Sequence, residues 1–121
     1  MKRDLELIRN ILLNIESSSK NRIYISDLTD DEGMAPIISL HIELLLDCNY
    51  LEATPIKTMC CHYQQFIIHR MTSQGYDYLD NIRDEKVWQK TKSQIGKVSS
   101  SVSLEVIKTV SSKIILGMLG I

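Results

Sequence analysis

Residues 35–53, APIISLHIELLLDCNYLEA, decide the fold that the sequence predicts. Their apolar side chains recur with the 3.6-residue period of a half-buried α-helix. Pro36 suits a first helical position, where its missing N–H costs nothing. We therefore expect the central helix of a small domain, followed by an extended segment over 51–56. One line of this helix carries Ile37, His41, Leu44, Cys48 and Leu51, with Ile38 and Leu45 beside it, and the opposite side carries Ser39, Glu43 and Asp47.

The residues before this helix predict a helix, a short strand and a second short helix. Residues 23–25 are β-branched or aromatic and favour a brief strand. Ser26 is a good N-cap for a helix over 27–32, which Gly33 is positioned to end. A three-residue joint to the central helix then gives the spacing of a helix-turn-helix. Residues 3–17 have the period of an amphipathic helix, and one line of it carries Leu5, Ile8, Leu12 and Ile15.

Beyond the central helix the period changes from 3.6 towards 2, which indicates a β-hairpin. Its arms are predicted at 51–54 and 65–70, joined by a loop that forms a wing. Thr72 can cap a helix over 73–83, and residues 84–95 continue or restart in helical form. The side chains expected to pack inward are Tyr76, Tyr78, Leu79 and Ile82 in the first of these helices and Val87, Trp88, Thr91 and Ile95 in the second.

The C-terminal part predicts one more helix. Residues 96–101, GKVSSS, have the composition of a flexible joint. The following apolar stripe either folds onto its own domain or pairs with a second copy as a coiled-coil-like contact, and we expect a homodimer. The residues expected to form that contact are Ile107, Val110, Ile114 and Met118.

The predicted fold class is mainly α with a small β-hairpin, a winged helix-turn-helix with a C-terminal helical extension. We expect a winged-helix domain over 1–95, the joint over 96–101 and an amphipathic helix over 102–121. A length of 121 residues suits one domain with a modest core, and 44% apolar with 24% charged residues is ordinary for a soluble globular chain. No internal repeat is visible.

The N-terminus is charged throughout and resembles no signal peptide, and no run of about 18 apolar residues is present to span a bilayer. We expect a cytoplasmic protein without membrane contact. The three cysteines include no C-x-x-C pair, so reduced thiols are the default and a disulfide framework is not indicated. A metal site from Cys60, Cys61, His62 and His69 would fit no common spacing, so we expect no metal and no other cofactor.

The sequence disfavours catalysis. It contains no G-x-S-x-G, no H-E-x-x-H and no glycine-rich phosphate loop, and no acid and base are paired at a recognisable spacing. His41 lies on the apolar face, where a buried neutral histidine bonded to a backbone or side-chain acceptor is the commoner arrangement. Cys48 is more typical of a core residue than of a nucleophile. We expect neither an enzyme nor a small-molecule receptor.

Three stretches resemble one bacterial and phage family of unknown function. They are MKRDLELIRNILLNIE at the start, SLHIELLLDCNYLEA in the centre, and MTSQGYDYLDNIRDEKVWQKTK after the wing. The resemblance implies a winged helix, because the L-T-x-x-G segment after a wing strand recurs in winged-helix repressors and Met71 to Gly75 match it. Met71 replaces the leucine of that motif, and Asn49 stands where relatives usually carry glycine. Because the function of this family is not established, the resemblance implies a fold and no activity.

The distribution of charge predicts what the domain binds. Residues 1–54 hold five basic and ten acidic side chains (5 − 10 = −5), whereas residues 55–121 hold nine and five (9 − 5 = +4). No Lys or Arg occurs between Ile25 and Ala53, which is unlike a DNA-reading helix. The leading hypothesis is therefore a protein partner, such as a nucleic-acid enzyme or a host factor, bound by an acidic face. Its expected residues are Ser39, Glu43, Asp47, Asp30 and Asp31.

The alternative is a regulator that contacts double-stranded DNA through the wing and the later helix, with Lys57, His62 and Arg70 as the expected contacts. A plain solvated surface remains open for both the acidic and the basic group.

Overall fold

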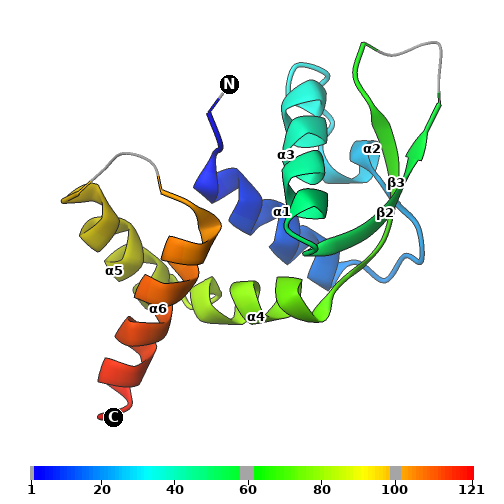
Figure 1. Ribbon diagram of the computed structural model, residues 1–121. Coiled ribbons are helices and arrows are strands. Elements are labelled where there is room, and N and C mark those ends of the chain that lie inside the picture. The colour runs from blue at the N-terminus through cyan, green and yellow to red at the C-terminus, as the bar shows by residue number, and fades with distance from the viewer. Residues whose placement is uncertain (1, 58–61, 99–101) are drawn as a thin grey trace. The chain divides into compact units, whose positions relative to one another are not determined.

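The computed structural model describes residues 2–57, 62–98 and 102–121 (Figure 1). The chain divides into two compact units after Tyr76, within helix α4 (Ser73–Ile82). The first unit holds the helix-turn-helix and the hairpin, and the second holds the C-terminal helices. The domain boundary expected after residue 95 stays a prediction.

The first unit has the element order of a winged helix. A helix, a strand, two further helices and two strands follow one another, and the strands form one antiparallel sheet in the order β1-β3-β2. The predicted fold class, mainly helical with a small sheet and a C-terminal helix, is confirmed. The elements are α1 (Leu5–Ser17), β1 (Ile23–Tyr24), α2 (Ile25–Leu28), α3 (Ala35–Asp47), β2 (Leu51–Ile56) and β3 (Gln65–Met71).

The sheet is mostly the wing hairpin. Strands β2 and β3 pair from Leu51 opposite Met71 to Ile56 opposite Gln65, with a bulge after Glu52. Figure 1 shows the two strands running side by side beyond α3. The short strand β1 adds to the other edge of β3, where Ile23 lies opposite Ile68. The hairpin predicted from the change of period is thus present, with both arms slightly longer than expected.

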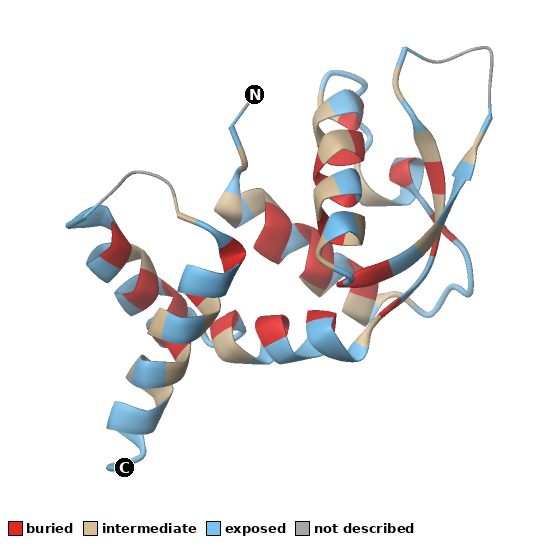
Figure 2. Cartoon of the chain, in the orientation of Figure 1, coloured by how far each residue is buried: buried red, intermediate tan, exposed pale blue. Residues whose placement is uncertain are grey.

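The core of the first unit lies between α1, α3 and the sheet, as the buried residues in Figure 2 show. The predicted buried line of α3 is rotated in the structure. Ile37 and Leu44 are only half-buried. The residues that follow each of them, Ile38 and Leu45, lie instead on the side of α3 that meets α1 and the sheet. The buried residues of α3 are Ala35, Ile38, Ser39, His41, Ile42 and Leu45, and those of α1 are Ile8, Arg9, Ile11, Leu12 and Ile15.

The short helix differs most from the prediction. Helix α2 spans Ile25–Leu28 rather than 27–32, and Tyr24 rather than Ser26 is its N-cap residue. Beyond it, the Thr29 hydroxyl accepts from the Asp31 N–H at 3.1 Å, and the Asp31 carboxylate accepts from the Gly33 N–H at 2.8 Å. Such local bonds compete with helical ones, so these residues form a turn.

In the second unit the predicted inward stripe of helix α5 (Glu85–Gly96) is confirmed, since all four of its expected residues are buried. Asp84 caps α5 by accepting from the Val87 N–H at 3.1 Å. Helix α6 (Leu104–Met118) packs on α5, and the Asn81 amide at the end of α4 donates to the Lys108 carbonyl at 3.3 Å and to the Ser112 hydroxyl at 2.9 Å. In the described ranges, no helix is long and apolar enough to cross a membrane.

One inward residue of α4 was predicted wrongly. Tyr78, Leu79 and Ile82 are buried, but Tyr76 is 42% exposed. Gly75 faces the backbone of Tyr50, and residues three, four and seven positions later share its side of the helix. Tyr76 lies about 100° round from that side and faces outward.

Candidate functional site

His41 is a structural residue, as the sequence indicated. Its side chain is fully buried, and the ring joins α3 to the start of α1. Nε2 accepts from the backbone N–H of Asp4 at 2.8 Å, so Nδ1 carries the hydrogen and donates to the Ile37 carbonyl at 2.7 Å. Asp4 in turn caps α1 by accepting from the Leu7 N–H at 3.0 Å. Both ring nitrogens are thereby used within the fold.

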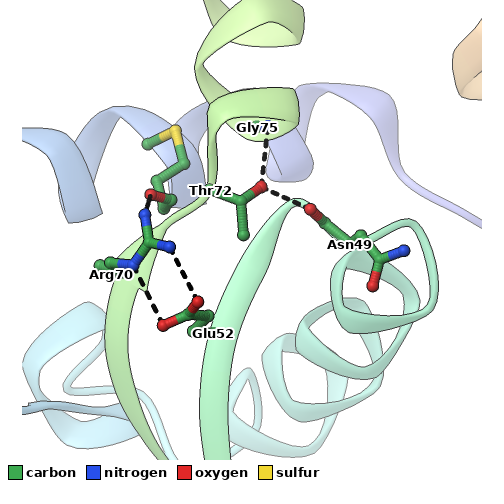
Figure 3. A network of polar contacts seen from close by, with 6 residues as sticks. Asn49, Glu52, Arg70, Thr72 and Gly75 are labelled. Carbon is green, nitrogen blue, oxygen red and sulfur yellow. Dashed lines mark hydrogen bonds and ion pairs between the residues drawn. The ribbon is translucent and has the colours of Figure 1, made fainter.

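A second polar network fixes the junction of α3, the wing and α4 (Figure 3). The Thr72 hydroxyl donates to the Asn49 carbonyl and accepts from the Gly75 N–H at 3.1 Å, which confirms Thr72 as the cap of α4. The Thr72 N–H donates to the Tyr50 carbonyl at 2.9 Å. Asn49 has φ of +60°, a backbone conformation that favours glycine, and this accounts for the glycine expected at that position in relatives.

Arg70, expected as a DNA contact, belongs to the same region. Its Nε and Nη2 donate to the two carboxylate oxygens of Glu52 on the neighbouring strand, at 3.0 and 2.8 Å (Figure 3). Its Nη1 donates to the Met71 carbonyl at 3.3 Å. The guanidinium is exposed, but its charge is already matched by a paired carboxylate across the hairpin. The other two expected DNA contacts, Lys57 and His62, are exposed near the wing loop.

The acidic face of α3 is present but smaller than predicted. Glu43 and Asp47 are exposed, as expected. Ser39 is only 3% exposed, and its hydroxyl donates to the Gln64 carbonyl at 2.6 Å, so its predicted place on the exposed face is wrong. The cause is the wing, which covers this flank of α3 from a position 25 residues later in the chain.

The same outward side of α3 carries apolar side chains. Leu40 and Leu44 are half-buried, and with about 100° per residue they project on the side of Glu43 and Asp47. Ile37 lies at the edge of this side and is also half-buried. The helix therefore presents carboxylates mixed with aliphatic side chains. We call Ile37, Leu40, Glu43, Leu44 and Asp47 the α3 face.

Asp30 and Asp31 lie in a separate place, the turn between α2 and α3. They are exposed and, with Glu32, line a hollow of about 300 Å³. Tyr63, which follows the wing loop, lines the same hollow. We call this the acidic hollow. Nearby, the Asp27 carboxylate accepts from Lys20 at 2.6 Å and from the Tyr24 N–H at 2.9 Å, and these bonds hold the pKa of Asp27 below its ordinary value.

A groove of about 380 Å³, lined by aliphatic and by polar side chains, lies between α1 and the α2–α3 turn, and we call it the α1 groove. Its sides are aliphatic and half-buried, and Asn10 and Asn14 are exposed at its rim. This groove was not predicted from the sequence. The sequence did contain one indication of it. Leu13 is an apolar residue of α1 that lies outside the predicted buried stripe, so a second apolar surface on this helix could have been expected. The side residues are Leu7, Leu13, Leu28 and Met34, above the buried Ile11 and Ile38.

The stripe of α6 divides into two parts. Ile107 is fully buried, so its side chain is not exposed for the predicted intermolecular contact. Val110 and Ile114 are half-buried, and Met118 is 53% exposed. Four apolar side chains at and just beyond the end of this helix are exposed, namely Leu116, Met118, Leu119 and Ile121. We call residues 113–121 the α6 end.

No group of three or more metal-ligating side chains occurs within the described residues. Cys60 and Cys61, considered above for a metal site, lie outside the described residues. Cys48 is half-buried.

Comparison with known proteins shows which family the chain resembles. A family model described as "Hypothetical protein (DUF2513)" matches residues 2–102. An uncharacterized protein of Haemophilus influenzae (strain ATCC 51907 / DSM 11121 / KW20 / Rd) is 36% identical over 122 residues, which cover 98% of this chain and 99% of the relative. No solved structure matches the chain. The chain therefore belongs to the family of hypothetical proteins designated DUF2513.

Proposed function

We propose that this protein is a non-enzymatic winged-helix module that binds a protein partner with a basic surface through the α3 face. The observation that supports this most directly is the chemistry of α3, the second helix of the helix-turn-helix. Its exposed charges are Glu43 and Asp47, and no Lys or Arg occurs between Ile25 and Ala53. In a DNA-reading winged helix this element lies in the major groove, between two phosphate backbones.

Both components of the α3 face favour a protein over a nucleic acid. Two exposed carboxylates repel a phosphate backbone, whose neutralisation provides most non-specific affinity for DNA. Half-exposed leucines add little on a duplex, but aliphatic side chains with a polar rim are the usual anatomy of a protein interface. Charge complementarity then selects a basic partner and speeds its association.

DNA binding through the wing is the second candidate, and one observation favours it. Lys57 and His62 are exposed near the wing loop, where a winged helix contacts the minor groove or backbone. Against it stands Arg70, the third expected contact, which is held by Glu52. The wing would have to bind duplex DNA with few free cations.

We also propose that the chain self-associates through the α6 end. This segment exposes four large apolar side chains, of which Leu119 is 67% exposed. Burying apolar surface contributes about 25 cal/mol per Å², so covering even part of these side chains with a second copy would stabilise the association.

The experiment that tests the proposed function is quantitative affinity capture from a lysate of the source organism. Tagged wild-type protein is compared with the variant Glu43→Lys/Asp47→Lys. Both positions are exposed, so the fold should be kept, and we expect capture of a basic partner to fall at least about tenfold through like-charge repulsion.

The matched control is Asp77→Lys/Glu105→Lys, which makes the same change of charge at exposed positions in the second unit. This variant should capture as much partner as the wild type. Equal capture by the wild type and the α3 variant would remove the α3 face as the binding surface. Equal loss in both variants would mean that only net charge matters.

A further inference from the structure

We infer that the α1 groove and the acidic hollow form one docking surface, and that its occupant is the α6 end of a second copy of this chain. This inference rests on the proposed self-association and gives it a site. It is independent of the α3 face and its basic partner. In this arrangement the depression on the first unit of one copy binds the exposed apolar α6 end of the other copy.

The groove has the composition of a site for aliphatic side chains. Leu13 on α1 and Leu28 on α2 form part of its two sides, and Ile11 and Ile38 lie buried beneath it. A volume of about 380 Å³ is at the lower end of the range of ligand-sized pockets, about 300–1,000 Å³. The groove is thus suited to a few side chains of an inserted helix.

The acidic hollow continues the groove, because Thr29 lines both. Asp30, Asp31 and Glu32 place three exposed carboxylates at this end. The Asp31 bond to the Gly33 N–H sets the turn that carries them. No Lys or Arg lines either depression within the described residues. The combined surface offers aliphatic side chains with a polar rim at one end and carboxylates at the other.

The α6 end has the complementary pattern. From Val106 to Ile121 the sequence contains Lys108 and Lys113 and no acidic side chain. Lys113 is exposed and precedes Leu116 by about one helical turn. A helix that places Leu116 and Leu119 in the groove would bring the cation of Lys113 to the acidic side. Charge therefore selects the orientation, and burial of Leu116 and Leu119 provides the stabilisation.

This surface is separate from the α3 face. Ile38, the α3 residue in the groove, lies about 140° round the helix from Glu43 at 100° per residue. A second copy in the groove and a basic partner on the α3 face would therefore use different sides of α3. The two proposals can fail independently.

Sedimentation velocity on the full chain, from about 1 to about 200 μM, tests the inference. The wild type should show concentration-dependent association. Asn10→Arg at the groove rim and Leu119→Ser in the α6 end should each weaken association at least about tenfold. Both residues are exposed, so circular dichroism should show an unchanged fold. Glu43→Lys/Asp47→Lys is the matched control and should associate like the wild type.

A charge exchange makes the test specific for the two partners. Lys113→Glu should weaken association, and Asp30→Lys/Glu32→Lys should do the same. Mixing these two variants pairs the reversed charges across the contact and should restore a heterodimer. A monomeric wild type at about 200 μM would overturn the inference. So would loss of association in Leu119→Ser with none in Asn10→Arg, which would indicate that α6 pairs with α6.

Discussion

Gly75 is the residue whose size the fold constrains most clearly. A Cβ at this position would lie 2.3 Å from the Tyr50 carbonyl oxygen and 2.6 Å from Cγ of Met71. The Tyr50 carbonyl is a backbone group held by the Thr72 N–H, so it cannot move aside without breaking that bond. The glycine of the L-T-x-x-G motif therefore allows the first turn of α4 to approach the α3–β2 junction.

We predict that Gly75→Ala lowers the free energy of unfolding by about 1–3 kcal/mol, the usual cost of overpacking. Urea unfolding followed by circular dichroism measures the change. Gly117→Ala is the matched control, because a Cβ there meets nothing within 4 Å and alanine favours a helix. An unchanged unfolding midpoint for Gly75→Ala would show that the junction relaxes freely.

Asp27 makes the joint between β1 and α2 sensitive to pH. Its carboxylate accepts from Lys20 and from the Tyr24 N–H, and both bonds hold its pKa below the ordinary value of about 3.9. A lowered folded pKa means that the ionised form stabilises the fold. That stabilisation is complete above the unfolded pKa and is lost as the pH falls through the lower folded value.

Asp27→Asn should therefore lower the urea midpoint at pH 7, and the difference from wild type should shrink as the pH falls below the ordinary aspartate pKa of about 3.9. The effect will be small and reduced by salt, because the Lys20 side chain is 60% exposed. Comparing both proteins at pH 7, 4 and 2 measures it. A difference that grows on acidification would contradict a lowered pKa for Asp27 in the folded protein.

At the scale of elements, prediction succeeded where the determinants are local. The buried stripe of α5 and the Thr72 cap of α4 follow from period and capping chemistry within a few residues, and both are present. The residue range predicted for helix α2 was wrong because the side chains of Thr29 and Asp31 form turns with the backbone. Hydrophobic periodicity contains no information about such turns.

Contacts between distant parts of the chain were not predictable. The period of α3 placed Ser39 opposite the main stripe, but the Gln64 carbonyl that buries it belongs to another element. The groove likewise combines residues of α1 with residues of the α2–α3 turn. Residues that share a helical face are visible in sequence, whereas the neighbour that covers a flank is not. The predicted exposure of Glu43 and Asp47 is confirmed, because at these two positions the helical period alone decides the exposure.

At the scale of the whole molecule, the charges disfavour non-specific binding to DNA. The formal net charge is −1, and several cations are already engaged: Lys20 pairs with Asp27, Arg70 with Glu52 and Arg83 with Asp80, and Lys92 lies over the Trp88 ring. Non-specific affinity for a duplex depends on cations that neutralise phosphates and release counterions. Few exposed cations remain for that purpose near the helix-turn-helix.

We therefore predict no saturable binding to random-sequence duplex DNA at about 50 mM salt, measured by fluorescence anisotropy with the full chain. A DNA-binding winged helix should bind under these conditions and lose affinity steeply towards about 200 mM salt. A salt-dependent signal would favour the wing, and Lys57→Glu should then abolish it. If the protein does not bind DNA and Glu43→Lys/Asp47→Lys loses its partner, α3 has the position of a DNA-recognition helix within the fold. Its exposed side chains, however, would bind a basic protein.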